Sequence, residues 1–273
     1  MADFITVITA GGIAMFSTIV GSFSGGATSL IMFPLMLIFV MSNYVDAFTL
    51  NKIATLFMTI SASRLHSKKH KINFRLFFTL LIFGIIGTAL GTYLIQYKLN
   101  EDFFKKLLAV CLIIIAVYLL ASKNKGVESR IHREIGIYSL LIVAVFSTFI
   151  NILNGIFGGT GLFLTIFFVI FFRMTFIESM IYTMPVYAII NIFQVPYLAY
   201  ITDIIQRYPI LTITMICCGL LGGIIGTKLQ YLKGNGLVKK VAVVIMIAIG
   251  LKTFIGGFYF KSSLFGSFAT LVK

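Results

Sequence analysis

The sequence predicts an all-α polytopic membrane protein made of two inverted repeats, each a glycine-broken hairpin or re-entrant segment plus three transmembrane helices. The first observation is composition: of 273 residues, 59% are hydrophobic and only 11% are charged, whereas soluble chains carry about 25% charged residues. The second is that apolar stretches long enough to cross a bilayer recur along the whole chain. The third is that glycine clusters interrupt these stretches at matching positions in the two halves.

Eight apolar blocks are bounded by polar or charged residues. Six have the length of a single spanning helix, but two are too long, because a helix of about 40 residues would extend about 60 Å. Each long block has its glycine cluster near the middle, so we expect two helical pieces with a break between them. The blocks are about 4–42, 46–63, 73–96, 103–121, 135–172, 177–200, 209–230 and 237–258.

The two halves repeat one another with offsets of roughly 130 to 135 residues. Asp46 and Glu178 stand at the starts of equivalent helices, and each half carries a second glycine series. We therefore expect a single transmembrane domain, 1–273, with repeat 1 at about 4–121, a cytoplasmic linker at 122–134 and repeat 2 at about 135–258. The second series comprises Gly84, Gly87 and Gly91 in the first half and Gly219, Gly222 and Gly226 in the second.

Positive charge is concentrated beside the predicted spans. Thirteen of the 22 lysines and arginines lie in or next to the stretches 64–72, 122–134 and 231–240, and the positive-inside rule places such loops in the cytoplasm. All three can be cytoplasmic only if block 135–172 enters and leaves on that side as a hairpin. By symmetry we expect block 4–42 to be a hairpin on the outer side. The halves then have opposite orientation, which is an inverted repeat. Nucleic-acid binding is not expected, because spanning helices separate the basic clusters.

The sequence shows no sign of catalysis or of a cofactor. The three cysteines lack CxxC spacing, no HExxH or GxSxG motif occurs, and every acidic residue lies at a block end or in a loop. We expect no enzyme activity, no cofactor and no metal site.

The glycine breaks are the predicted substrate site. A break inside a bilayer leaves backbone groups that protein, water or ligand must satisfy, and a helix that begins there attracts anions through its free N–H groups. Close helix packing is the alternative explanation of the glycines, and for the second glycine series it is the preferred one. The candidate residues at the breaks are Gly25, Gly26, Thr28, Gly158, Gly159 and Thr160.

Four further polar residues are candidate substrate contacts. Lys52, beside Asn51, is a cation within an apolar block, and such a residue usually faces a cavity or a partner. Its alternatives are a side chain that reaches the outer interface or pairs with Asp46. Asn154 and Asn191 could donate to an oxyanion or could join two helices by a hydrogen bond.

Candidate coupling or gating residues are fewer. Asp46 and Glu178 could carry protons or could cap helix starts. His66 is the one histidine placed for a proton relay, and a solvated loop residue is the alternative. Pro185 could form a hinge or could sit in a tolerated bend.

The order of these motifs resembles the TauE/SafE sulfite exporter family, also called the 4-toluene sulfonate uptake permease family, over roughly residues 10–255. The chain departs from the family pattern at Asn154, where many relatives carry an acidic residue, and near Met184, where some carry a lysine. The motifs are Ser24-Gly25-Gly26 with Pro34, Leu50-Asn51-Lys52-Ile53, the helix end Ser61 to His66, the Gly84 series, Gly155 to Gly161, and Asn191.

The resemblance implies a permease for small sulfur-containing anions such as sulfite or organosulfonates, usually an exporter. Alternating access around a site near the membrane midplane is the expected mechanism. An importer of a different small anion or sulfur compound is the main alternative, and an ion channel is less favoured because the symmetry is internal. Membrane lipid is an expected partner. The sequence leaves open a homodimer and the proton as coupling ion.

Overall fold

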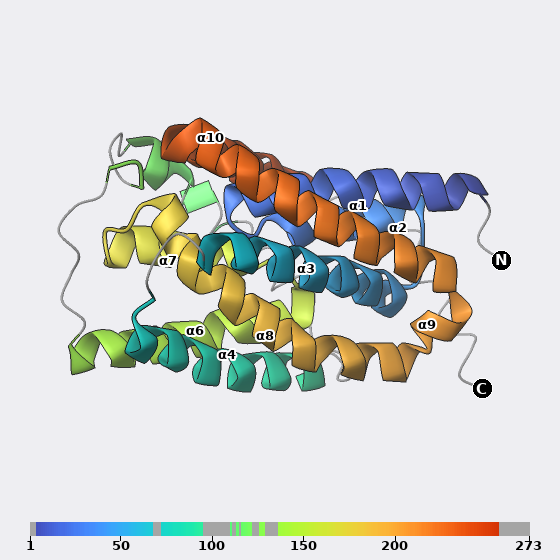
Figure 1. Ribbon diagram of the computed structural model, residues 1–273, viewed down its shortest axis with the longest axis horizontal. Coiled ribbons are helices and arrows are strands. Elements are labelled where there is room, and N and C mark those ends of the chain that lie inside the picture. The colour runs from blue at the N-terminus through green and yellow to red at the C-terminus, as the bar shows by residue number, and fades with distance from the viewer. Residues whose placement is uncertain are drawn as a thin grey trace.

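Helices make up the regular structure of this chain (Figure 1). The computed structural model describes residues 4–67, 72–94, 110, 113–114, 116–121, 126–128 and 136–256. These residues contain no strand, and the predicted all-α class is confirmed. Most of the expected helix 103–121 and of the linker 122–134 lies outside them. The helices are α1 (Phe4–Ser24), α2 (Thr28–Phe39), α3 (Tyr44–Ser67), α4 (Phe74–Leu94), α6 (Ile137–Phe157), α7 (Gly161–Phe171), α8 (Phe176–Thr202), α9 (Ile204–Arg207) and α10 (Pro209–Gly256).

Both over-long apolar blocks are divided where the glycines predicted a break. Block 4–42 is the pair α1 and α2, and block 135–172 is the pair α6 and α7. The second helix of each pair has only 12 and 11 residues. At 1.5 Å per residue it is about 18 Å long, well short of the roughly 30 Å of a bilayer's hydrocarbon core. Each block is therefore a long helix followed by a half-length one.

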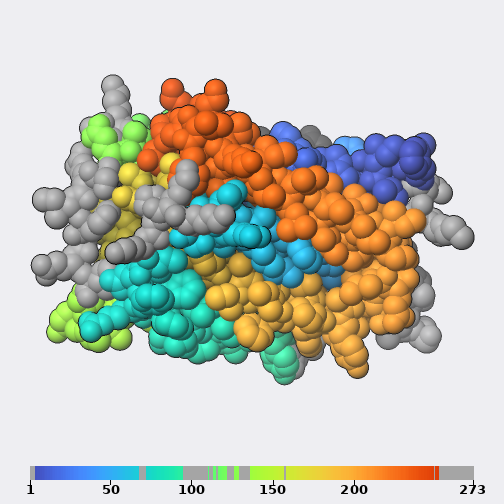
Figure 2. All heavy atoms as spheres, viewed as in Figure 1, coloured from blue at the N-terminus to red at the C-terminus, as the bar shows by residue number. Residues whose placement is uncertain are grey.

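Within the described residues, α1, α4, α6, α8 and α10 contain stretches long and apolar enough to cross a membrane. Large apolar side chains are exposed along them, among them Phe78 and Ile86 of α4 and Ile192 and Tyr200 of α8. Figure 2 shows α4, α8 and α10 on one face of the molecule. An apolar outer surface suits contact with lipid, and the chain is a multi-pass membrane protein.

The halves interlock through their glycine-rich helices. α4 of the first half packs on α6 of the second, and α10 of the second packs on α1 of the first. A methyl group at Gly87 would strike the Thr148 carbonyl oxygen, and one at Gly226 would strike that of Ile19. The second glycine series thus lies in close helix contacts, and the prediction that it serves packing is confirmed.

The helices that the predicted repeat would pair run in opposite directions. In Figure 1 α1 and α3 run from right to left, whereas α6 and α8 run from left to right. α4 runs to the right and the first part of α10 to the left. α8 is continuous through Pro185 and Pro196, so neither proline breaks it.

Parts of the three basic stretches meet at one end of the molecule. His66 Nδ1 lies 2.8 Å from the Tyr231 hydroxyl, and Asn235 Nδ2 donates to the Val127 carbonyl oxygen over 3.5 Å. Two expected loops are shorter than predicted. α3 continues to Ser67, and 231–240 is helical on both sides of Gly234, whose φ of 73° makes a tight turn within α10. The prediction of a loop at 231–240 was wrong, because a turn at a single glycine is enough to reverse the chain.

Candidate functional site

The two glycine breaks lie against each other. A Cβ built on Gly26 would be 2.8 Å from Gly161 Cα, and one built on Gly159 would be 2.9 Å from the backbone nitrogen of Leu30. The Thr165 hydroxyl donates to the Gly25 carbonyl oxygen over 2.9 Å. The start of α2 therefore touches the start of α7, and side chains at these glycines would prevent the contact.

A cavity of about 20 Å³ lies at this junction, enough for about one water-sized sphere. Seven of the ten predicted substrate residues line it, and they come from both halves of the chain. These seven are Gly25, Gly26, Thr28, Lys52, Asn154, Gly159 and Asn191.

The other three predicted residues lie next to the cavity. Asn51 Nδ2 would be 3.5 Å from a Cβ built on Gly158, and the Thr160 hydroxyl lies 3.4 Å from that of Tyr187, a lining residue. The ten residues are thus brought together, while their role in binding stays a prediction.

Lys52 is buried at this site. Its side chain is 1% exposed, its Nζ donates to Asn154 Oδ1 over 3.1 Å, and the Phe48 ring centroid lies 5.3 Å away. Asp46 instead pairs with Arg207 at 2.7 Å. Neither alternative for Lys52 holds, since it does not reach the interface and does not pair with Asp46. Among the described residues it has no salt bridge.

Several amide groups near Lys52 are buried without a hydrogen-bond partner in the described part of the chain. Both polar atoms of Asn51, both of Asn191, and Nδ2 of Asn154 are in this state. Buried polar groups are nearly always satisfied by protein, water or ligand. The bare amides and the ammonium together suit a ligand rich in oxygen atoms.

The helix starts at the site lack the side-chain caps that α3 and α8 have, as does the start of α6. α3 begins with Asn43 Oδ1 accepting from the backbone N–H groups of Val45 and Asp46, and α8 begins with a capping box between Thr175 and Glu178. In the described structure α2 and α7 have no side-chain cap. Their positive ends therefore remain available to an anion.

Sequence reasoning missed part of the lining. Thr59, Thr183 and Tyr187 all line the cavity and were not among the predicted substrate residues. The offset that relates Asp46 to Glu178 also relates Thr59 to Asn191 and Asn51 to Thr183. Applying the repeat to each candidate would have found both threonines.

The four predicted coupling or gating residues do not line the cavity. Asp46 is in the ion pair with Arg207, Glu178 is in the capping box of α8, and Pro185 lies within that helix. His66 is fully buried, so a solvated loop position was wrong: the last turn of α3 packs it against Tyr231. A role of these residues in coupling stays a prediction.

Comparison with known proteins identifies the family of this chain. A family model described as sulfite exporter TauE/SafE matches residues 10–253. The chain belongs to the sulfite exporter TauE/SafE family. The resemblance drawn from the glycine and asparagine motifs is thereby confirmed, over almost the predicted range.

A curated relative agrees with this family. It is a "Probable membrane transporter protein" of Haemophilus influenzae, 35% identical over 112 residues. The match covers 41% of this chain and 42% of the relative, so the chain spans less than half of that protein's length. No solved structure matches. The names of the TauE/SafE family and of this relative agree with the expectation that the chain is not an enzyme.

Proposed function

We propose that this protein is a permease that moves small sulfur-containing anions, such as sulfite or an organosulfonate, across the membrane by alternating access, in the direction of export. Membership of the TauE/SafE family and the name of the Haemophilus relative support transport. The anion is bound where the starts of α2 and α7 meet. An importer of a different small anion or sulfur compound is the alternative, since gradients decide the direction of flux.

The observation that carries the proposal is the burial of Lys52 without a carboxylate partner among the described residues. An ammonium group away from water is costly unless a negative charge or hydrogen bonds compensate it. Asn154 supplies one oxygen, and the uncapped helix starts add further positive potential. An anion bound here would supply the missing charge.

An inverted repeat suits this mechanism. The opposite directions of α1 and α6, and of α3 and α8, support two repeats of about 4–121 and 135–258 in inverted orientation. Contacts among His66, Tyr231, Asn235 and Val127 bring the basic stretches to one end, which we assign to the cytoplasm by the positive-inside rule. The hairpin α1–α2 then enters from outside and α6–α7 from inside.

The test is flux of labelled sulfite in right-side-out and inverted vesicles, with and without a pH gradient. Lys52→Met removes the charge at nearly the same length, and Lys228→Met, at an exposed position of α10, is the matched control. We expect Lys52→Met to reduce flux to background and Lys228→Met to leave it unchanged.

If folded wild-type protein moves none of sulfite, sulfonates and thiosulfate, the proposal of an anion permease is contradicted. Full flux in Lys52→Met would contradict the assigned site instead. Dependence on the pH gradient would identify the proton as coupling ion and make Asp46, Glu178 and His66 the next positions to test. A homodimer and specific lipid contacts stay predictions.

A further inference from the structure

Two interfaces that the repeat makes equivalent differ in this structure. The offset that relates Gly84 to Gly219 also relates Thr88 to Gly223. The slightly shorter offset that relates Asp46 to Glu178 pairs Met58 with Ile190 and Ser61 with Phe193. The pair α3–α10 therefore corresponds to the pair α8–α4, and each pair joins one helix of the first half to one helix of the second.

The α3–α10 interface is closed. A methyl group at Gly223 would overlap the Ser61 hydroxyl and the carbonyl oxygen of Met58, so α10 rests directly on the backbone of α3. In Figure 2 the atoms of α10 (orange) lie against those of α3 (blue). This contact leaves no room for a solute between the two helices.

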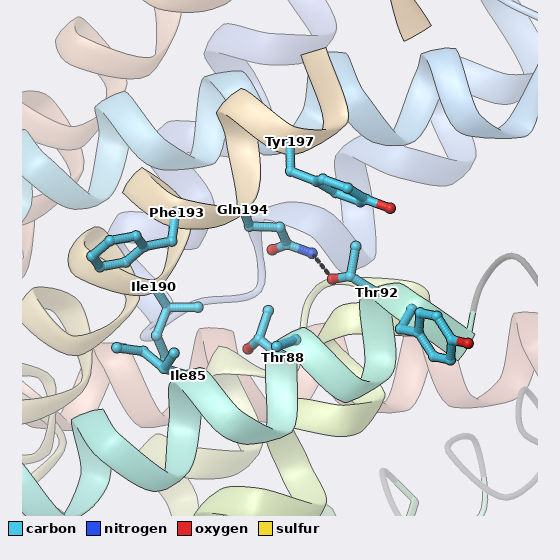
Figure 3. Close-up of a pocket in the computed structure, with 9 residues that line it drawn as sticks. Ile85, Thr88, Thr92, Ile190, Phe193, Gln194 and Tyr197 are labelled. Atoms are coloured by element: carbon cyan, nitrogen blue, oxygen red, sulfur yellow. Dashed lines mark hydrogen bonds between the residues drawn. The ribbon is translucent and has the colours of Figure 1, made fainter. Parts of the chain in front are cut away.

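The equivalent α4–α8 interface is open. A cavity of about 310 Å³ lies between the helices there, although they touch beside it, since a Cβ built on Gly84 would be 2.8 Å from Ile190 Cδ1. The equivalents of the three closed positions, Thr88, Ile190 and Phe193, line the cavity. Figure 3 shows Phe193 and Ile190 on the wall formed by α8 and Thr88 on the wall formed by α4.

The cavity contains a buried polar group that the described chain leaves unsatisfied. Gln194 is 5% exposed, its Nε2 donates to the Thr92 hydroxyl over 2.9 Å (Figure 3), and its Oε1 has no partner. If the amide oxygen and nitrogen exchange places, the bare atom becomes a donor. In either orientation one polar atom of this side chain has no partner in the described chain.

A series of polar side chains leads from this cavity to the glycine breaks. The Thr88 hydroxyl lies 3.5 Å from Asn151 Oδ1. Asn151 is about one helical turn before Asn154, whose Oδ1 accepts from Lys52 Nζ. On the α8 side, Ile190 lines the large cavity while its neighbour Asn191 lines the small one. Neighbouring residues of α8 therefore line the two spaces.

The open and closed interfaces face opposite ends of the molecule. The large cavity is lined by the C-terminal halves of α4 and α8, which run away from the end that contains His66 and Tyr231 (Figure 1). Met58 and Ser61 lie in the C-terminal half of α3, which runs toward that end. The large cavity thus lies toward the end that we assign to the outside, and the closed contact lies toward the other end.

We propose that the α4–α8 cavity is the outer passage of the anion path, with Gln194 as a polar contact for the passing anion. In the alternative state of the protein this passage closes, and Thr88 then meets Ile190 and Phe193 as Gly223 meets Met58 and Ser61 here. The proposal rests on the proposed function and adds to it the residues of the outer gate.

The closure is tested by cross-linking in proteoliposomes. Thr88→Cys and Phe193→Cys are combined in a protein whose Cys111, Cys217 and Cys218 are replaced by Ser. We expect an oxidant to form the disulfide and to abolish sulfite flux, and a reductant to restore it. Each single cysteine variant is the matched control, and we expect its flux to be the same with and without oxidant. A pair that never cross-links in a transporting protein, or one that cross-links with flux unchanged, would overturn the gate.

The role of Gln194 is tested by Gln194→Leu, with flux and the anion-induced rise in melting temperature measured together. We expect flux to fall while the rise in melting temperature persists, because the central site around Lys52 is intact. Unchanged flux, or loss of both signals, would overturn a contact confined to the passage. A failure of the proposed function can be distinguished from a failure of the gate. In the first case the wild-type protein also shows no flux, while cross-linking of the cysteine pair can still be measured.

Discussion

Glycines at the breaks and glycines on the long helices meet different physical demands. Gly26, with φ of 108°, needs a backbone conformation that L side chains rarely adopt, and it also lies against Gly161. Gly91 is helical and needs only the absence of a side chain, because α6 passes over it at Ile152. Strain and contact can therefore be separated by substituting alanine at chosen positions.

The largest effect is expected at Gly26, where both demands apply. Gly26→Ala would force the backbone from its positive φ and push α7 from α2, at a cost of about 4 kcal/mol in the free energy of unfolding. We expect a strongly lowered melting temperature in detergent and no anion flux. A melting temperature equal to that of wild type would show that the break tolerates a side chain.

Gly91 tests contact without strain. Gly91→Ala places a methyl group against the Ile152 carbonyl oxygen and 3.0 Å from Gly155 Cα. Backbone atoms cannot turn aside as a side chain can, so α4 and α6 must separate, at a cost of about 3 kcal/mol. The measurement is again the melting temperature. A fall in melting temperature smaller than that of Gly234→Ala would reverse the order that we assign to contact and strain.

Gly234 tests strain without contact. Its φ of 73° and ψ of 172° lie in a region almost reserved for glycine, but a Cβ there would have nothing within 4 Å. We expect Gly234→Ala to cost about 2 kcal/mol, with sulfite flux retained because the turn is far from the site. Loss of flux from a folded Gly234→Ala protein would contradict this separation of the turn from the pathway.

Gly12 tests neither demand and serves as the reference. It lies in α1 and a Cβ would again meet nothing within 4 Å. Gly12→Ala is expected to stabilise the protein by about 0.5 kcal/mol, because alanine loses less backbone freedom in a helix. A destabilised Gly12→Ala protein would reveal a neighbour that the described residues do not supply.

The sequence predicted the breaks well because length alone requires them. A block of about 40 residues cannot be one spanning helix, and the glycines then mark the point of division. The conformation of Gly234 was not foreseen, since a basic stretch gives no sign that one residue will reverse the chain. The burial of Lys52 was left open, because the sequence does not show whether Asp46 pairs with Lys52 or with Arg207. Arg207 lies in α9, 161 residues after Asp46.

The α4–α8 cavity was beyond prediction for a different reason. Sequence similarity between the repeats identifies equivalent positions. It therefore leads one to expect the same packing at the two equivalent interfaces. The difference between Thr88 and Gly223 is visible in the sequence, but which interface is open depends on the conformational state. Internal symmetry can therefore identify the parts of a transporter without identifying the state in which they are found.

The uncapped starts of α2 and α7 have a consequence for the unloaded protein. Two positive helix ends and the ammonium group of Lys52 lie together inside an apolar body, and they repel one another when no anion separates them. An anion bound as we propose would reduce this repulsion. We therefore expect the resistance of the protein to heat to rise with the concentration of that anion, and the protein without it to be degraded more easily.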